Sequence, residues 1–277
     1  MTAIAHLSKD RPLLLVGGGN MGGALARGWL AAGLDAAALW VVEPRGGQAV
    51  PFVPAEQVVP AAEALPAALA PALIVLAVKP QVMAGVLAPL RPLVDGGAGV
   101  LSIAAGIRTA TLQAGLGGDA RIVRAMPNTP AAVGEGVSVA VPSGPVGEDD
   151  RALADALLAA AGAVVWVADE ALLDGVTAVS GSGPAYVFHL VEALAAAGIG
   201  AGLPEALATE LAERTVIGAA ALMKQSGQSA PDLRRQVTSP QGTTAAALDV
   251  LMGEDGLTRL MTRAVRAAAD RSRALSG

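Results

Sequence analysis

A short corner near the C-terminal end of the chain concentrates hydrogen-bonding side chains. "RQVTSPQGTTAAAL", Arg235 to Leu248, interrupts an alanine-rich, helix-forming region with a proline, a glycine and several hydroxyl residues. The composition predicts that helices run up to Val237 and resume near Thr244. Because the first N–H groups of a helix have no partner within it, this corner is a candidate anion site. The same hydroxyl residues are also typical helix caps, so the residue types alone leave both interpretations open.

A glycine pattern near the N-terminus predicts a phosphate site. "LLLVGGGNMGGALARGWL" contains Gly17-x-Gly19-x-x-Gly22 between a strand-like run and a helix-like one. There the first glycine permits a tight turn, the second lets backbone approach a pyrophosphate, and the third lets the helix pack on the strand. The free N–H groups at the helix start add Asn20 and Met21 as candidate contacts. A plain strand–helix turn is the alternative, whereas a Walker A loop is excluded because no Gly-Lys-Ser/Thr follows.

Two charged residues at the end of the next strand-like run bear on the choice of dinucleotide. Glu43 lies about 20 residues after the glycines, where an acid binds the ribose 2′-hydroxyl of NAD. Arg45 lies two residues further on and is suited to the 2′-phosphate of NADP. The two signals conflict, and both side chains could also be solvated loop charges.

Three further segments follow strand-like runs, where the carboxyl ends of parallel strands line a ligand crevice. "AVKP" offers a lysine, "SIAAGI" offers small side chains that leave room for a flat ring, and "RAMPNTP" forms a rigid loop. Lys79 either faces the cofactor or only begins the next helix. The small residues of "SIAAGI" could equally be required by tight packing. The candidate cofactor contacts in these segments are Ala77, Val78, Lys79, Pro80, Ile103, Ala104, Ala105 and Asn128.

The remaining pattern predicts two domains. Short apolar runs alternate with helix-like segments in the first half, which predicts a largely parallel sheet covered on both faces. After residue 169 the strands vanish, and the composition predicts an all-helical second half. We therefore predict an α/β dinucleotide-binding domain at 1–168 with a Rossmann-type doubly wound sheet, and an all-α domain at 169–277. The predicted strands are Leu13–Val16, Leu39–Val42, Leu73–Val78, Val100–Ile103, Ile122–Ala125, Val137–Val141 and Val164–Val167. The predicted helices of the first half are Met21–Ala32, Gln81–Leu90, Thr109–Leu116 and Asp149–Ala161.

Composition excludes several classes of site and protein. The 277 residues include no cysteine, so disulfides, thiolate metal ligands and a cysteine nucleophile are excluded. The chain has two histidines, which argues against a histidine-rich metal site. A net charge of -5 with no basic tract disfavours nucleic-acid binding. No run predicts a membrane span or a signal peptide, so we expect a cytoplasmic protein.

Five segments together resemble pyrroline-5-carboxylate reductases. They are "VGGGNMGGAL" (16–25), "AVKP" (77–80), "RAMPNTP" (124–130), "DGVTAVSGSGPAY" (174–186) and "VTSPQGTT" (237–244), in family order along nearly the whole chain. The resemblance implies reduction of 1-pyrroline-5-carboxylate to L-proline, the last step of proline biosynthesis, with NAD(P)H. It also implies that the helical domain forms a homodimer, with rings of dimers as a further level of assembly. The charge and the apolar runs, by contrast, are the reason to expect no nucleic-acid or membrane partner.

The resemblance assigns roles at the corner. The carboxylate of the substrate is expected at Ser239, Gly242, Thr243 and Thr244, with the Thr244 hydroxyl on the ring nitrogen as the catalytic contact. Glu170 aligns with a family acid near the substrate, although charge compensation at a helix N-terminus would equally explain it. No metal is expected.

The chain departs from the family pattern at a few positions. Relatives usually read Ser-Pro-Gly-Gly at the corner, where this chain has Gln241 as its third residue. If that position needs a positive φ, the glutamine is strained by about 1–2 kcal/mol. Residues 54–72 also lack an asparagine that often contacts the cofactor ribose. With Glu43 present, the choice between NADP(H) and NAD(H) stays open, and family habit favours NADP(H).

Three other functions remain alternatives. A β-hydroxyacid dehydrogenase shares the two-domain plan but uses a lysine that "SGSGPAYVFHLVEAL" lacks. A related enzyme would reduce a different cyclic imino acid, such as a six-membered one. A non-catalytic dinucleotide-binding protein is disfavoured by the intact corner.

Overall fold

The structure is a computed structural model that describes residues 3–276. The chain divides into two compact units. The first is the described part of Met1–Gly181 together with Ala269–Gly277, and the second is Ser182–Ala268. The boundary expected after residue 168 falls inside the first unit.

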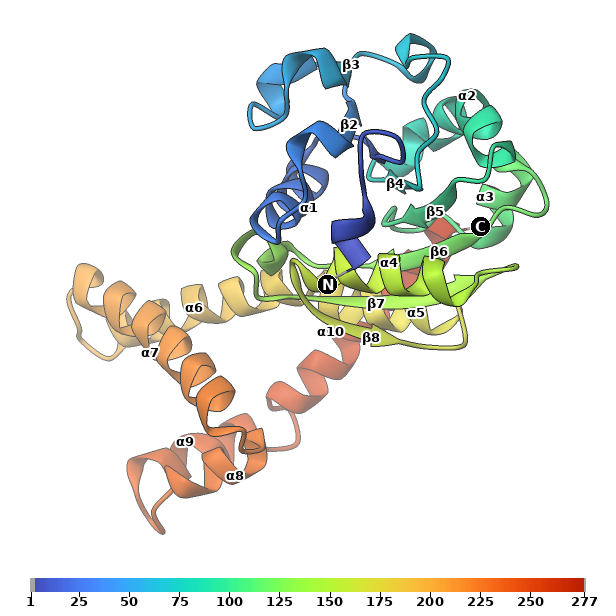
Figure 1. The fold of residues 1–277 in the computed structure, drawn as a ribbon. Coiled ribbons are helices and arrows are strands. Elements are labelled where there is room, and N and C mark those ends of the chain that lie inside the picture. The colour runs from blue at the N-terminus through green and yellow to red at the C-terminus, as the bar shows by residue number, and fades with distance from the viewer. Residues whose placement is uncertain (1–2, 277) are drawn as a thin grey trace. The chain divides into compact units, whose positions relative to one another are not determined.

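An eight-stranded sheet forms the centre of the first unit (Figure 1). Its strand order is β3-β2-β1-β4-β5-β6-β7-β8, and every neighbouring pair is parallel except β6 and β7. Leu13 of β1 pairs with Leu39 of β2 on one side and with Leu73 of β4 on the other, so the order in which strands are added to the sheet reverses at β1. The strands are β1 Leu13–Val16, β2 Leu39–Val42, β3 Val58–Val59, β4 Leu73–Leu76, β5 Gly99–Ser102, β6 Ile122–Met126, β7 Gly136–Ser143 and β8 Gly162–Trp166.

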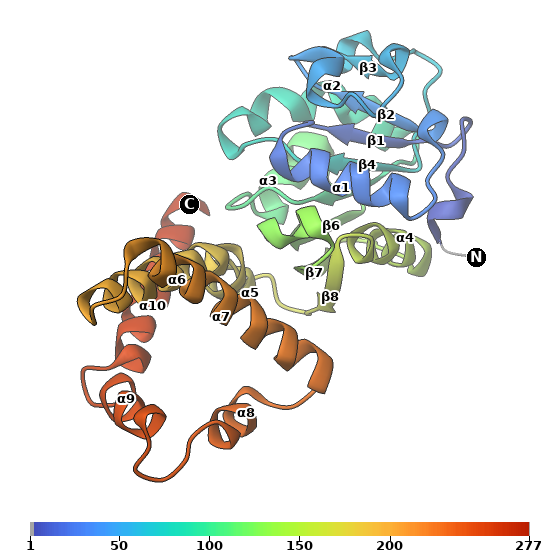
Figure 2. The ribbon, with the colours of Figure 1, turned by 90° about the vertical axis from the view of Figure 1, so that its left-hand side faces the viewer.

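Helices cover both faces of this sheet, because its central strands are apolar on both sides. Alternate residues of β1 belong to different cores: Leu13 and Leu15 to one, Leu14 and Val16 to the other. The helices α1 (Asn20–Ala31) and α4 (Glu148–Ala159) cover the first face, and Figure 2 shows α1 in front of β1 and β4. The helices α2 (Met83–Asp95) and α3 (Thr109–Leu116) cover the second.

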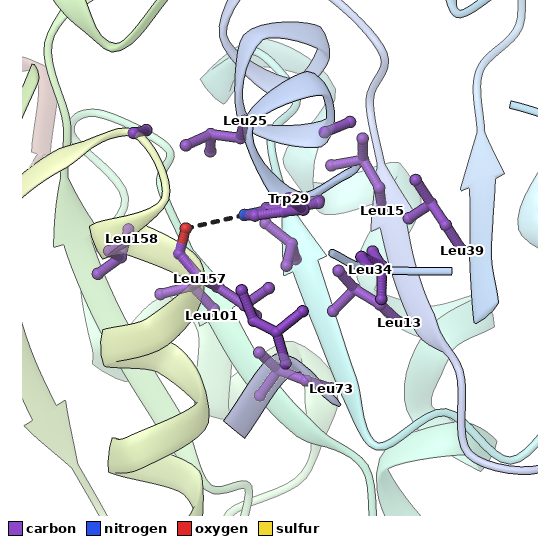
Figure 3. Close-up of a cluster of buried hydrophobic side chains, with 14 of the residues drawn as sticks. Leu13, Leu15, Leu25, Trp29, Leu34, Leu39, Leu73, Leu101, Leu157 and Leu158 are labelled. Atoms are coloured by element: carbon purple, nitrogen blue, oxygen red, sulfur yellow. Dashed lines mark hydrogen bonds between the residues drawn. The ribbon is translucent and has the colours of Figure 1, made fainter. Parts of the chain in front are cut away.

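Trp29 ties the two helices of the first face together. Its ring is fully buried among leucines, and its Nε1 donates a hydrogen bond to the carbonyl of Leu157 at 2.8 Å (Figure 3). A buried indole N–H needs such a partner, so this bond fixes α4 against α1. The helix that begins at the glycine turn is thereby held in place.

The predicted fold class is confirmed, and most elements lie where the pattern placed them. β1, β2 and α3 have their predicted bounds, whereas β4 ends two residues before Val78. β3 was not predicted, because two paired residues carry no periodic signal. The loops also contain short 3₁₀ helices: η1 Ala3–His6, η2 Ala36–Ala38, η3 Gly46–Ala49, η4 Ala55–Gln57, η5 Ala62–Ala64, η6 Pro80–Val82 and η7 Thr129–Val133.

The C-terminal part is helical, as predicted. A π-helical turn, η8 (Thr177–Gly181), joins α5 (Leu172–Val176) to α6 (Gly183–Gly200). The other helices are α7 (Glu205–Ser226), α8 (Ala230–Gln236), α9 (Thr243–Leu251) and α10 (Leu257–Ser276). The last turns of α10 belong to the first unit, where the Ser272 hydroxyl donates to Asp174 Oδ1 at 2.6 Å.

The second unit leaves most of its apolar surface exposed. α6 and α7 pack against each other, and Gly198 lies close to Ala208. Yet Ala208 and Ala212 are the buried apolar residues that this unit contributes, while Phe188 and Val250 are 65% and 74% exposed. An exposed apolar surface of this extent marks an association surface. No helix in the described part of the chain has both the length and the apolar character needed to cross a bilayer.

Candidate functional site

The glycine turn after β1 is built so tightly that two of its glycines tolerate no side chain. Gly17 has φ +102°, and a Cβ there would lie 2.8 Å from the carbonyl carbon of Ala77. A Cβ on Gly22 would lie only 2.1 Å from the Gly17 oxygen. By contrast, a Cβ on Gly19 would meet nothing within 4 Å. The first and third glycines therefore close the turn, and the second leaves open space where a ligand can approach the backbone.

A cleft of about 720 Å³ lies beside this turn, at the carboxyl ends of β1, β2, β4 and β5. That volume is in the range that holds a cofactor. Twelve of the fifteen predicted cofactor residues line it: Gly17, Gly19, Asn20, Met21, Glu43, Arg45, Ala77, Val78, Lys79, Ile103, Ala104 and Ala105. Pro44 and Val82 line it as well and were not predicted, since nothing in their residue types indicates a ligand.

The other three predicted cofactor residues do not line the cleft. Gly22 packs against the turn, and Pro80 begins η6 directly after Lys79. Asn128 is buried, and its side chain joins two segments: Oδ1 accepts from the Val137 N–H at 2.9 Å, and Nδ2 donates to the Ser180 carbonyl at 3.3 Å. These bonds hold the loop after β6 to β7 and to the π-helical turn.

Glu43 and Arg45 form one bonded group at the end of β2. Glu43 is buried, and its Oε2 accepts from the Gly18 N–H at 2.9 Å. Its Oε1 accepts from the Arg45 backbone N–H at 3.1 Å and from Arg45 Nε at 2.8 Å. The hydrogen bond from the Arg45 side chain lowers the pKa of Glu43, against burial, which raises it. Glu43 is therefore an ionised carboxylate that is already satisfied by its own chain.

Glu170 binds residues far away in the sequence. Its Oε1 accepts from the Thr109 N–H at 2.8 Å, from Thr109 Oγ1 at 2.7 Å and from Arg124 Nη1 at 2.7 Å. Burial raises the pKa of Glu170, but the bonds from Arg124 and Thr109 outweigh it and the net shift is downward. Because Thr109 is the first residue of α3, the carboxylate lies at the N-terminus of that helix, where negative charge is favoured.

The hydroxyl corner in the second unit lies between two helices. α8 ends at Gln236 and α9 begins at Thr243, with Gly242 as its N-cap. Among the corner's hydroxyls, Thr238 donates to the Arg234 carbonyl at 2.6 Å. The Ser239, Thr243 and Thr244 side chains form no hydrogen bond within residues 3–276, and no side chain caps α9. The capping interpretation thus applies to Thr238 and α8, whereas the N-terminus of α9 is left for another partner.

Two backbone features shape this corner. A Cβ on Gly242 would lie 2.4 Å from Ser239 Oγ and 3.2 Å from the Ser239 carbonyl oxygen, so a side chain there would force the Ser239 hydroxyl to move. Gln241 has φ 59°, the left-handed region, and no other non-glycine residue in the described chain has a positive φ. The position that relatives fill with glycine therefore does require that conformation, which costs a residue with a Cβ about 1–2 kcal/mol.

Gln241→Gly is expected to stabilise the protein. Glycine removes the left-handed strain but loses more backbone entropy on folding, so we expect a net gain of about 0.5–1 kcal/mol in the free energy of unfolding. Chemical denaturation at fixed protein concentration, monitored by circular dichroism, measures this change in the free energy of unfolding. Gln225→Gly, in the last turn of α7, is the matched control and should not stabilise the protein, because glycine there brings only its backbone-entropy cost. A loss of stability in Gln241→Gly would show that the conformation is not strained.

Comparisons with known proteins bear on these two sites. Residues 170–275 match the family model described as "Pyrroline-5-carboxylate reductase dimerisation", and residues 13–106 match "NADP oxidoreductase coenzyme F420-dependent". A pyrroline-5-carboxylate reductase of Pseudomonas aeruginosa is 39% identical over 265 residues, 95% of this chain and 96% of its own length. The chain belongs to the pyrroline-5-carboxylate reductase family. It is accordingly an NAD(P)H-dependent oxidoreductase with a Rossmann-type domain.

Solved structures agree with this assignment. A pyrroline-5-carboxylate reductase from Coxiella burnetii superposes with a TM-score of 0.88 at 35% identity, covering 97% of this chain and 99% of that one. The Plasmodium falciparum enzyme, solved with NADP bound, gives a TM-score of 0.82 at 30% identity with the same coverages. The family's dimerisation region coincides with the exposed apolar helices, which indicates a homo-oligomer. No group of residues that could hold a metal ion is found within the described chain.

Proposed function

We propose that the protein reduces 1-pyrroline-5-carboxylate to L-proline with NAD(P)H, and that the corner at 239–244 binds the substrate. The observation that carries the substrate assignment is the N-terminus of α9. It presents backbone N–H groups and the hydroxyls of Ser239, Thr243 and Thr244, to which no other residue within 3–276 is hydrogen-bonded. Helix N-termini of this kind bind carboxylates, and a cyclic imino acid carries one beside its ring nitrogen.

The cleft of the first unit fits the cofactor. The N-terminus of α1 and the open space at Gly19 suit the pyrophosphate, and Ala104 and Ala105 leave room for a flat ring. The bound cofactor supplies the hydride, and the residues of the chain bind it and hold it in place. Asn128 does not line the cleft, and its bonds to Val137 and Ser180 support a structural role rather than a cofactor contact.

Reduction of an imine requires little acid–base catalysis by the protein. The hydride adds to the ring carbon of the C=N bond, the C–N double bond becomes single, and the nitrogen keeps the proton of the iminium. Positive charge leaves the ring as the hydride arrives, so the site should not bind the iminium tightly. A neutral hydroxyl such as that of Thr244 fits this need, because it hydrogen-bonds the nitrogen without placing a cation beside it.

Glu170 has a different role in this proposal. Its Oε1 is occupied by Thr109 and Arg124, so we assign it to holding α3 and β6 together rather than to binding substrate. Ser239, Gly242, Thr243 and Thr244 remain the substrate residues.

The activity is tested by mixing purified protein with NADPH and pyrroline-5-carboxylate. Falling absorbance at 340 nm with L-proline as product supports the proposal. A faster reaction with a six-membered imino acid would favour the related reductase. Tight cofactor binding with no turnover of any imine would favour the non-catalytic protein.

Thr244→Ala is expected to lower kcat/KM for the imine by about ten- to a hundredfold. The reason is the loss of one hydrogen bond to a charged group, on the order of 1–3 kcal/mol. Thr111→Ala, on the exposed side of α3, is the matched control and should leave the kinetics unchanged. Steady-state kinetics of Thr244→Ala that equal those of the wild type would remove Thr244 from the mechanism.

The assembly is proposed to be a homodimer that associates further into a ring of dimers in the cytoplasm. The exposed side chains of α6, α7 and α9 support association, since single helices with this much apolar surface do not stay separate in water. Light scattering on the purified protein distinguishes a dimer of the 27.3 kDa chain from a larger ring.

A further inference from the structure

We infer that Arg45 selects NADPH by binding the 2′-phosphate of the cofactor, and that Glu43 is the residue that positions Arg45 rather than a ligand of the ribose. This inference rests on the proposed NAD(P)H-dependent function and names the nucleotide that the cleft prefers. It resolves the conflict between an acid that is typical of NAD sites and an arginine that is typical of NADP sites, two residues apart.

The first step concerns the two oxygens of Glu43. An acid that selects NAD accepts hydrogen bonds from the ribose hydroxyls through its carboxylate. Here Oε1 already accepts two bonds from Arg45, and Oε2 accepts from the Gly18 N–H and, at 3.4 Å, from Arg45 Nη2. The side chain is also only 7% exposed. Binding a ribose through this carboxylate would require breaking bonds that hold the glycine turn.

The second step concerns the guanidinium of Arg45. Its side chain is 66% exposed and lines the cleft. Nε and Nη2 are anchored on Glu43, and the remaining N–H donors have no partner in the described chain. A guanidinium fixed at one edge and open at the other is suited to a phosphate, which accepts several such bonds.

The third step concerns the space around Arg45. The next two residues are Gly46 and Gly47, and a Cβ on either would meet nothing within 4 Å. The two residues that follow Arg45 therefore bring no side chain of their own, and the space at their Cβ positions is open. Since Pro44 precedes Arg45 and Glu43 is bonded to its backbone N–H, the position of the arginine is fixed while its outer side stays open.

Binding of nucleotide fragments tests the inference without any turnover. Calorimetric titration should show that adenosine 2′,5′-bisphosphate binds the wild-type protein at least tenfold more tightly than 5′-AMP. Arg45→Ala should remove this preference, and Arg45→Lys should keep part of it. Arg91→Ala, in an exposed ion pair on α2, is the matched control and should keep all of it. Equal affinity of the wild type for both nucleotides, or an unchanged preference in Arg45→Ala, would overturn the inference.

Glu43→Gln tests the positioning role. The amide keeps one acceptor oxygen for the Gly18 N–H, so 5′-AMP affinity should stay within about threefold, while the preference for the bisphosphate falls. The same substitution should change that preference no further in the Arg45→Ala background. A tenfold loss of 5′-AMP affinity, or a higher preference for the bisphosphate, would overturn the role. If the bisphosphate preference holds but no imine is reduced, the proposed function fails and this inference stands.

Discussion

Gly22→Ala is expected to weaken NADPH binding by about a hundredfold or more and to destabilise the first unit by about 2–3 kcal/mol. The added methyl group would lie 2.1 Å from the Gly17 oxygen and 3.1 Å from the Ala77 side chain, both parts of the cleft. The helix and the turn must therefore move apart by about an ångström, and displacements of that size in a binding site commonly cost a factor of a hundred. Overpacking of a tight contact adds the stability loss.

The neighbouring residue provides the control. A Cβ on Gly23 would lie 3.5 Å from the Gly18 oxygen, an ordinary contact, in the same turn of α1. The NADPH affinity of Gly23→Ala should therefore stay within about threefold of that of the wild type. Its stability should equal or exceed that of the wild type, because alanine favours a helix more than glycine does. Fluorescence titration with NADPH and thermal unfolding measure both effects. Equal binding by the two variants would show that the turn is not as rigid as its contacts indicate.

Glu170→Gln is expected to lower the free energy of unfolding of the first unit by about 2–4 kcal/mol. Arg124 is 7% exposed at its side chain, and the substitution leaves this buried guanidinium without its counter-ion. Removing one partner of a buried ion pair costs about 3–5 kcal/mol. The loss is smaller here because the Glu170 side chain is 30% exposed and because glutamine keeps one acceptor oxygen. The three tryptophans, Trp29, Trp40 and Trp166, all lie in the first unit, so their fluorescence during denaturation reports on it.

The control and the pH dependence make this prediction specific. Asp95→Asn breaks the exposed Arg91–Asp95 pair, at 3.8 Å, and should change stability by less than ~0.5 kcal/mol. Because the pKa of Glu170 is lowered on folding from its ordinary value of 4.5, its contribution is complete above that pH. It is lost as pH falls through the lower, folded pKa. The stability difference between wild type and Glu170→Gln should therefore shrink on acidification below pH 4.5, and a constant difference would contradict the assignment.

Much of the fold followed from the pattern of apolar residues. The runs at β1 and β2 predicted their strands because both faces of these strands are buried, and the glycine spacing predicted the turn between β1 and α1. The cofactor cleft was predictable for the same reason, since parallel strands bring their carboxyl ends to one edge. The start of α9 was predictable because Pro240 and Gly242 interrupt a helix-forming composition.

What the sequence did not predict depends on contacts between distant residues. Glu170 finds Thr109 and Arg124 at separations of 61 and 46 residues, which no local pattern encodes. Asn128 was expected at the cofactor, but its amide bridges Val137 and Ser180, and its residue type is equally suited to both uses. The π-helical turn η8 also has no periodic signal, because one extra residue in a helix leaves its composition unchanged.

A crystal structure of the protein with NADP⁺ and L-proline tests the central claim most directly. The account predicts that the proline carboxylate accepts hydrogen bonds from the N–H groups at the start of α9, with the ring nitrogen at the Thr244 hydroxyl and the nicotinamide in contact with the ring. Proline bound elsewhere, with residues 239–244 free of ligand, would contradict it.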